Sequence, residues 1–335
     1  MTQRWKNRPQ GSNWGEFGED DQLGRLNLIG QEQVLKGIRE VKEGKNFCLS
    51  LPLDYPGGNV LSPVRFPPKL KPVIRNNAPY FNYEWGQVDS SLKDIAADDA
   101  VLLHTQYSTQ WDSLAHRGSV FDADGDGMPK PVYYNGFRAG EDLVFDGDSS
   151  CARKLGIENM AAHGVQGRAV MVDLHSTYGN DPAAVGYEAL MEIMEQQQVR
   201  IEAGDILCLW TGLDRLILES AGNPNESLRH ACAALNGWDS KLLEWITQSG
   251  VAAIASDNIA VEIIKKPLPK DHCGTSLPLH DHCLFKLGIH LGELWHLADL
   301  SEWLREHQRN RFLLTAAPLR LTGSVGSPVT PVATV

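Results

Sequence analysis

From residue 168 onward, short apolar segments alternate with segments in which apolar residues recur at helical spacing. The apolar runs predict buried strands at 168–174, 204–212, 251–256 and 312–315. The helical spacings predict helices at about 184–198, 239–249 and 299–307. Nearer the start, a helix is expected at about 31–43 and a strand at 47–53. Alternation of this kind predicts a mixed α/β layer fold.

The segments before this pattern suggest how the chain is divided. Residues 1–20 are polar and lack periodicity, so they are expected to form an arm that becomes ordered only by lying on another surface. We therefore predict an N-terminal arm and helix over 1–46 and one large domain over 47–335, which a chain with 42% hydrophobic residues can fill with a core. Repeated Pro and Gly predict a long surface excursion at 54–82.

Charge and hydropathy narrow the choice of partners. The formal net charge is -11 and there is no run of Lys or Arg, which argues against binding to nucleic acid. No window approaches the roughly 20 apolar residues that cross a membrane, and the first residues lack the apolar core of a signal peptide. The sequence thus predicts a cytoplasmic protein whose partner is a small molecule.

Two features resemble metal or disulfide sites but are better explained otherwise. The six cysteines lie far apart without a Cys-x-x-Cys pair, so reduced and mostly buried thiols are expected. The segment 122–127, Asp-Ala-Asp-Gly-Asp-Gly, resembles the opening of a calcium loop. Its twelfth position would be Tyr133 where such a loop requires Glu, so an exposed Asp/Gly turn is predicted.

The stretch 103–118 places polar side chains where a core strand would carry apolar ones. Gln106, Gln110 and Asp112 are evenly spaced, so an extended chain would direct all three to one side, and His116 follows four residues later. A carboxylate and an imidazole brought together are typical of a divalent-metal site or an acid–base pair. The alternative is a hydrogen-bonded pair of Asp112 and His116 that only stabilises the loop. Trp111 would point the opposite way, into the core.

A second polar cluster occupies 271–296. It contains Asp271, His272, His280, Asp281, His282, His290, Glu293 and His296. Histidines in such a run are more often solvated or hydrogen-bonded side chains than functional groups, and we interpret His272, His282, His290 and His296 in that way.

The central stretch resembles a motif of the metal-dependent cyclase-like hydrolases, which include bacterial kynurenine formamidase, isatin hydrolase and trans-dienelactone hydrolase. The family motif, His-x-Gly-Thr-His-x-Asp-x-Pro-x-His, aligns with residues 106–116, where Thr109, Asp112 and His116 match it. Gln106 and Gln110 stand in place of the two leading histidines. The segments 167–173, 204–212, 288–293 and 317–328 also resemble family landmarks, and the first 45 residues resemble its longer subgroup.

The resemblance implies a swivelling β/β/α fold and a homodimer or homotetramer, with the N-terminal arm reaching a neighbour. It also implies that Asp112 binds metal, that His116 is the catalytic histidine, and that His280 and Glu293 are later metal ligands. Because this chain carries one residue more than usual between His280 and Gly288, His282 remains a rival ligand.

The two glutamines bear on the metal. An amide oxygen is a hard donor that suits Mn²⁺ or Mg²⁺ better than Zn²⁺. We expect one divalent ion, which is Zn²⁺, Mn²⁺ or Mg²⁺. Gln106 and Gln110 either bind this ion directly or form hydrogen bonds to its ligands. By analogy with the family, metal-activated water would hydrolyse a small cyclic or acyl amide, formamide or lactone. His116 would pass the proton to the leaving atom, and Glu293 would be the base if His116 binds the ion.

Two other functions fit the same residues. The first is a lyase or cyclase that uses the ion to stabilise an enolate, and the second is a relative that binds a small molecule without turnover. A screen of products by mass separates the first from hydrolysis, because hydrolysis adds the mass of water.

Overall fold

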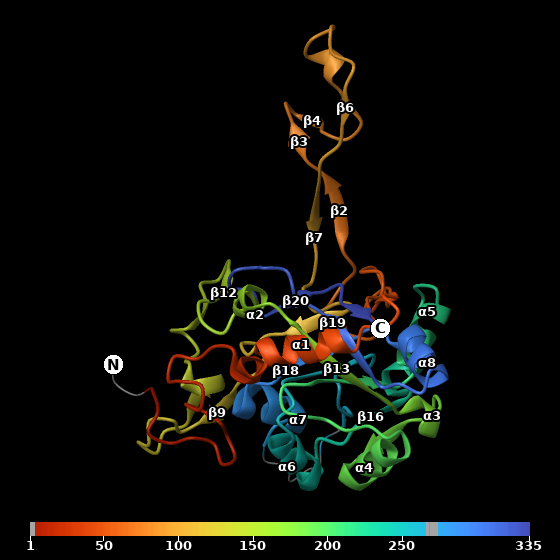
Figure 1. The fold of residues 1–335 in the computed structure, drawn as a ribbon. Helices are drawn as coiled ribbons and strands as arrows, with labels where there is room; N and C mark the ends of the chain where they lie inside the picture. The colour runs from red at the N-terminus through yellow and green to blue at the C-terminus, as the bar shows by residue number, and fades with distance from the viewer. Residues whose placement is uncertain (1–3, 266–267, 269–273) are drawn as a thin grey trace.

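The computed structural model describes residues 4–265, 268 and 274–335, so Asp271 and His272 lie outside the described residues. Its centre is a nine-stranded sheet with the order β1-β21-β19-β13-β15-β17-β18-β8-β20 (Figure 1). These strands are β1 (Asn46–Cys48), β8 (Gln110–Asp112), β13 (Gln166–Asp173), β15 (Ile206–Trp210), β17 (Ala253–Ser256), β18 (His290–Glu293), β19 (Arg311–Thr315), β20 (Gly326–Pro328) and β21 (Val332–Thr334).

The middle of the sheet is parallel and its two sides are antiparallel. Strands β13, β15, β17 and β18 run in parallel, whereas β19 is antiparallel to β13 and β8 is antiparallel to both β18 and β20. Along β13, Val170 and Val172 belong to one hydrophobic cluster while Ala169 and Met171 belong to another. The sheet is therefore buried on both faces, which explains the continuous apolar runs and confirms the predicted mixed α/β class.

Helices cover the sheet and connect its strands. They are α1 (Gln31–Arg39), α2 (Ile157–His163), α3 (His175–Tyr178), α4 (Tyr187–Gln196), α5 (Leu213–Glu219), α6 (Ser240–Ser249), α7 (Pro278–His280), the π-helix η5 (Asp281–Leu287) and α8 (Ala298–Glu306), with 3-10 turns η1 (Gly24–Leu28), η2 (Trp85–Gln87), η3 (Tyr134–Gly136) and η4 (Glu226–His230). Helix α1 packs on β13 and β19. At Gly37 a Cβ atom would lie 2.8 Å from the carbonyl carbon of Gly167, so the close approach requires glycine.

Helix α1 ends at Arg39 and not at the predicted 43. The backbone N–H groups of Glu43 and Gly44 donate to the Val335 carbonyl, so these residues follow the edge of the sheet where strand β1 begins.

Residues 4–30 lie on the body of their own chain. Trp5 and Trp14 are buried within one of the two large core clusters, and the Trp14 indole N–H donates to the Phe285 carbonyl at 2.8 Å. The Arg25 guanidinium donates to the carbonyls of Ile246 and Thr247 at the end of α6. The segment is thus ordered by tertiary contacts, as its composition predicts. The division of the chain at residue 46 stays a prediction.

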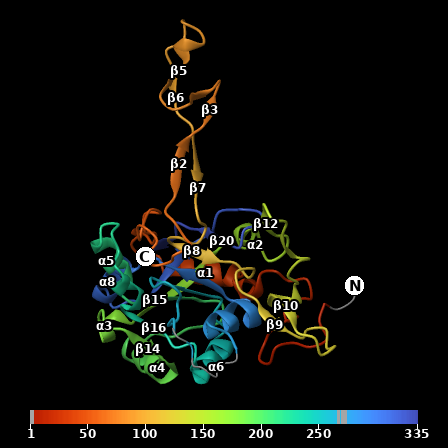
Figure 2. The same cartoon turned by 180° about the vertical axis from the view of Figure 1, so that it is seen from behind.

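A narrow β-ribbon projects from the body in both views of the molecule (Figures 1 and 2). It consists of β2 (Lys69–Pro72), β3 (Ile74–Arg75), β4 (Ala78–Pro79), β5 (Tyr83–Glu84), β6 (Ile95–Ala96) and β7 (Asp99–Leu102). The predicted surface excursion thus extends to residue 102. Three further two-stranded pairs are β9 (Ser119–Phe121) with β10 (Lys130–Val132), β11 (Leu143–Phe145) with β12 (Ser150–Ala152), and β14 (Ala183–Val185) with β16 (Ala233–Leu235).

The aspartates of the segment 122–127 form hydrogen bonds and ion pairs with neighbouring residues of the same loop. The Asp122 carboxylate accepts hydrogen bonds from the backbone N–H groups of Asp126 and Gly127, which closes a tight turn. Lys130 forms ion pairs with Asp124 at 2.6 Å and with Asp126 at 3.3 Å. The segment is therefore an Asp/Gly turn whose negative charge is partly balanced by Lys130.

The described cysteines, which exclude Cys273, are all free, and Cys208, Cys232 and Cys283 are buried, as expected for reduced thiols. In the part of the chain that the structure describes, every helix is too short or too polar to cross a lipid bilayer.

Candidate metal centre

Strand β8 brings two polar side chains to the candidate site. Gln110 and Asp112 are fully buried on one side of the strand, while Trp111 points to the other side. There Trp111 meets Trp295 edge to face, with ring centroids 4.9 Å apart. The period-two alternation thus directs an amide and a carboxylate away from the aromatic core.

Glu293 enters the site from the neighbouring strand. It is the last residue of β18 and lies directly opposite Gln110 in the antiparallel register. Because paired residues project to the same side of a sheet, their side chains meet, and Gln110 Nε2 donates to Glu293 Oε2 at 2.6 Å.

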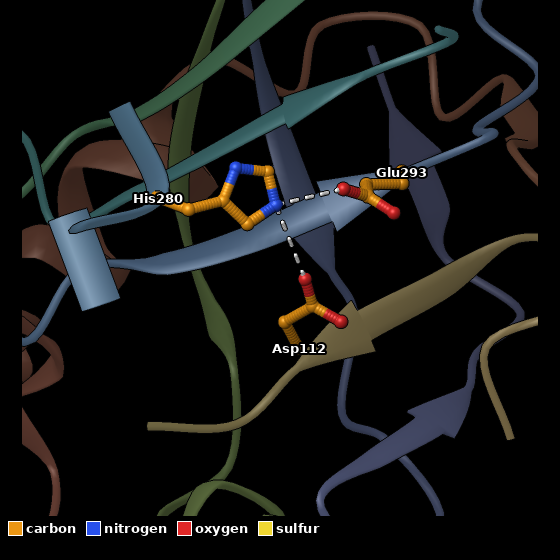
Figure 3. A group of neighbouring side chains, drawn as sticks. All are labelled: Asp112, His280 and Glu293. Atoms are coloured by element: carbon orange, nitrogen blue, oxygen red, sulfur yellow. Dashed lines mark hydrogen bonds and ion pairs between the residues drawn. The ribbon is translucent and has the colours of Figure 1, made fainter. Parts of the chain in front are cut away.

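His280 completes the cluster from the short helix α7, far from β8 in sequence. Its Nε2 atom lies 3.2 Å from Glu293 Oε1 and 3.9 Å from Asp112 Oδ2 (Figure 3). Asp112, His280 and Glu293 each offer one ligand atom, and these atoms lie within 4.8 Å of one another. Two predicted regions of the sequence therefore converge on one buried point.

A fourth residue, Glu262, orients His280 and was missed by sequence reasoning. Its Oε1 atom lies 2.8 Å from His280 Nδ1 and accepts the His280 backbone N–H, while Oε2 accepts the Leu279 N–H at 3.0 Å. The sequence did carry one signal, a lone carboxylate within the apolar run 260–264. Val261, immediately before it, has a φ of 56°, a costly conformation for a β-branched residue.

The charges around His280 favour its protonated form when no ion is bound. Burial by itself lowers the pKa of this imidazole, but hydrogen bonds to Glu262 and Glu293 outweigh that effect and raise the pKa to about 9. Burial, together with the negative charge of Asp112, raises the pKa of Glu293. The cluster therefore concentrates negative charge that a cation at its centre would stabilise.

Gln106 and His116 lie beside the cluster, although not in the predicted way. The extended conformation is limited to β8, and Gln106 belongs to a preceding turn. Its side chain folds back so that Nε2 donates to Asp112 Oδ1 and lies 2.8 Å from His116 Nδ1. His116 Nε2 is 3.8 Å from Asp112 Oδ2, and burial lowers the pKa of His116 to about 4.

The other described histidines of the segment 271–296 have other partners. His282 Nε2 lies 2.8 Å from the Thr247 hydroxyl on α6, so it is His280 and not His282 that lies with Asp112. His290 Nδ1 contacts the Asp112 carbonyl at 2.9 Å, and His296 Nδ1 contacts Asp214 at 3.0 Å. His272 lies outside the described residues.

The donor set fits a divalent cation. Asp112 Oδ2 and Gln110 Oε1 are buried polar atoms without a hydrogen-bond partner among the described residues. Leaving such atoms unpaired costs free energy, which a cation bound between them would offset. Two carboxylates, one imidazole and amide oxygens are ligands found at Zn²⁺, Mn²⁺ and Mg²⁺ sites in proteins.

A narrow cavity borders the cluster on the side of Gln106. Its lining includes Arg65, Tyr107 and Leu294, and its volume of about 10 Å³ is close to the space of one water molecule. Arg65 Nη1 donates to the Gln106 carbonyl at 2.7 Å, so the guanidinium closes one wall.

The fold and the family are shown by comparison with known proteins. Residues 49–263 match the Cyclase family, described as “Putative cyclase”, and the chain belongs to this family. This confirms the resemblance found in the sequence. A search of curated proteins gave no match.

Solved structures share the architecture over most of the chain. A crystal structure described as a novel cyclase is 29% identical with a TM-score of 0.76, covering 97% of both chains. An isatin hydrolase bound to the product analogue thioisatinate is 14% identical with a TM-score of 0.55, covering 92% of this chain and 99% of its own. Isatin hydrolase A from Ralstonia solanacearum is 16% identical with a TM-score of 0.53, covering 86% and 91% respectively. At these identities, the two hydrolases support the fold alone.

Proposed function

We propose that this chain is a metal-dependent hydrolase that cleaves a small cyclic or acyl amide, formamide or lactone. The observation that carries the proposal is the buried group of Asp112, His280 and Glu293, in which Asp112 Oδ2 has no hydrogen-bond partner among the described residues. Membership of the Cyclase family and the shared fold of isatin hydrolases support it.

Asp112, His280 and Glu293 would hold one divalent ion, with Gln110 Oε1 as a further donor. Bound there, the ion would supply a Lewis acid that polarises a substrate carbonyl and acidifies a water molecule. Amide donors favour Mn²⁺ or Mg²⁺, while Zn²⁺ remains compatible with the imidazole and carboxylates. Glu262 would orient His280, and its contact with Nδ1 leaves Nε2 directed at the cluster.

His116 would move a proton between the water and the leaving atom. Its side chain is 17% exposed, whereas the side chains of Asp112, His280 and Glu293 are almost fully buried. For Nε2 to accept a proton, the ring must carry its own hydrogen on Nδ1, and the Gln106 amide must then present its oxygen to the ring. With the amide turned in this way, Gln106 Nε2 no longer donates to Asp112 Oδ1. A bound ion would compensate the Asp112 carboxylate for the lost hydrogen bond. Gln106 therefore sets the tautomer of His116, and Glu293 is the alternative base.

Elemental analysis of the purified protein, combined with a panel of lactones, isatin-like imides and formyl-anilides, tests the proposal. We expect Asp112→Ala to abolish both retention of the ion and turnover. Asp257→Asn is a control for the loss of a buried carboxylate elsewhere, because Asp257 accepts the backbone N–H groups of Thr211 and Gly212 and, among the described residues, forms no hydrogen bond with the proposed ligands. Unchanged ion content in Asp112→Ala, or full activity of the metal-free protein, would contradict the proposal.

The family description and the solved novel cyclase favour one rival function, a lyase or cyclase reaction through an enolate. Product masses separate the two reactions. A product heavier than its substrate by one water supports hydrolysis, and a product of unchanged mass supports cyclisation or isomerisation.

A further inference from the structure

A second cavity lies at the same edge of the sheet as the metal centre. Its volume is about 640 Å³, which is enough to hold a small organic molecule. Asp173, the last residue of β13, lines this cavity, just as Glu293 ends β18 at the metal centre. Strands β15 and β17 lie between β13 and β18, so the two places are separate. Sheets with parallel strands commonly bind ligands beyond the carboxyl ends of those strands.

Helices α4 and α8 reach the cavity from opposite faces of the sheet and end there in the same way. At each end, two backbone N–H groups turn back to carbonyls of the last helical turn. The residue at the turning point is Gln198 after α4 and Gln308 after α8, with φ of 54° and 53°. Both amide side chains line the cavity, and neither forms a hydrogen bond among the described residues. Their donors and acceptors are therefore available to a ligand.

The cavity carries one positive charge in excess. The charged side chains of its lining are Asp173, Arg305 and Arg309. Arg305 Nη1 lies 3.3 Å from Asp173 Oδ2, while the Arg305 side chain remains 54% exposed. A guanidinium has five N–H donors, so this contact leaves most of them for another acceptor. Arg309 is held in place because its Nη2 donates to the Glu40 carbonyl.

A buried hydroxyl group lies in the wall of the cavity. Ser301 of α8 is 2% exposed, and its Oγ atom has no hydrogen-bond partner among the described residues. Buried hydroxyl groups are normally hydrogen-bonded, so this exception requires an explanation. A hydroxyl group of a ligand in the cavity would provide the partner.

We propose that this cavity is a second binding site, whose ligand is a polyhydroxy carboxylate such as a sugar acid. The single excess positive charge matches one carboxylate, which a guanidinium binds through two parallel hydrogen bonds. Amide groups both donate and accept hydrogen bonds, as hydroxyl groups do, so the amides at the ends of α4 and α8 match the hydroxylated part of the ligand. The proposal concerns binding alone and does not depend on the hydrolase function.

Isothermal titration calorimetry of the full chain with gluconate and galactonate tests the proposal. We expect at least one of them to bind about 10-fold or more tightly than acetate, which has only the carboxylate, and glucose, which has only the hydroxyl groups. Binding of neither sugar acid, or equal binding of acetate or glucose, would overturn the proposal. Sugar acids also chelate metal ions, so Asp112→Ala should bind them with unchanged affinity. Loss of binding in Asp112→Ala would assign it to the metal centre and overturn the second site.

Substitutions within the cavity locate the ligand. We expect Arg305→Gln to weaken binding by about 10–100-fold, because a charge-assisted hydrogen bond is lost, and to leave turnover and ion content unchanged. Arg215→Gln is the matched control, since Arg215 is 33% exposed and forms an ion pair with Glu302 of α8 outside the lining of the cavity. Equal affinity of these two variants would overturn the proposal, and thermal unfolding shows whether each is folded.

Ser301→Ala gives an independent measurement. It should weaken binding by about 2–10-fold, the effect of one hydrogen bond, without lowering the free energy of unfolding in urea. Unchanged affinity together with lower stability would show that the hydroxyl group only stabilises α8, and would contradict its role in the site.

Discussion

The orientation of His280 by Glu262 leads to a quantitative prediction for Glu262→Gln. The carboxylate now serves three N–H groups: the backbone N–H groups of Leu279 and His280, and Nδ1 of the His280 ring. The amide keeps one oxygen and places an NH₂ group where the other stood, so at least one buried donor loses its acceptor. Such a loss costs about 1–3 kcal/mol of folding free energy.

The effect on ion binding is expected to be of similar size. Replacing a carboxylate that orients a ligating histidine weakens metal affinity by about 10–100-fold, or roughly 1.4–2.7 kcal/mol. Competition between the metal-free protein and a chromogenic chelator for Mn²⁺ or Zn²⁺ measures the affinity, and urea unfolding measures the stability.

Asp214→Asn provides a control in which a buried carboxylate with similar donors is replaced, because the Oδ1 atom of Asp214 also accepts the Trp210 indole N–H and the Arg215 backbone N–H, and an amide cannot accept at both positions. Asp214 Oδ2 accepts the backbone N–H groups of Leu297 and Ala298 and contacts Nδ1 of His296 at 3.0 Å, and it contacts none of the proposed ligands. It should lose comparable stability and keep its ion affinity. If Glu262→Gln binds the ion as tightly as Asp214→Asn does, the orienting role of Glu262 is refuted.

Three further outcomes are expected. His116→Ala should lower turnover by about 10²–10⁴ while elemental analysis shows unchanged ion content; loss of the ion would instead make His116 a ligand. Gly37→Val should lower the free energy of unfolding in urea by about 2–3 kcal/mol, because its Cβ would force α1 away from Gly167, and unchanged stability would contradict that packing. Burial lowers the pKa of His282 to about 4, so the unfolded chain takes up the proton first as the pH falls below about 6.5. The His282 contribution of about 3 kcal/mol should therefore be lost between about pH 6.5 and 4, and urea unfolding of His282→Gln should show a correspondingly smaller decline.

The parts of the fold that local pattern determines could be predicted from the sequence. Strands such as β13 and β15 are apolar because both of their faces are covered, and the alternation of Gln110, Trp111 and Asp112 follows from the pleat of a strand. The prediction was wrong at Gln106, which lies in a turn. There the Thr109 side chain accepts the Leu51 N–H and donates to the Leu294 carbonyl, contacts that bend the chain before β8 begins.

Features that depend on distant partners were not predictable. Glu262 acquires its role only because α7 returns to it after a long connection, and its immediate neighbours in sequence are apolar. The projecting β-ribbon exposes residues such as Leu70, whose apolar side chain would on composition alone be expected in a core. For Glu262 the decisive contact lies outside any window of the sequence in which periodicity can be measured.

Strand β8 is only three residues long, and its two sides serve unrelated purposes, aromatic packing at Trp111 and polar chemistry at Gln110 and Asp112. Adding or removing one residue immediately before it would rotate an indole into the polar pocket and a carboxylate into hydrocarbon. Relatives and engineered variants should therefore tolerate changes of length in the projecting ribbon and none between 109 and 113. Changes to this polar cluster are consequently limited to exchanging side chains on a backbone of fixed length.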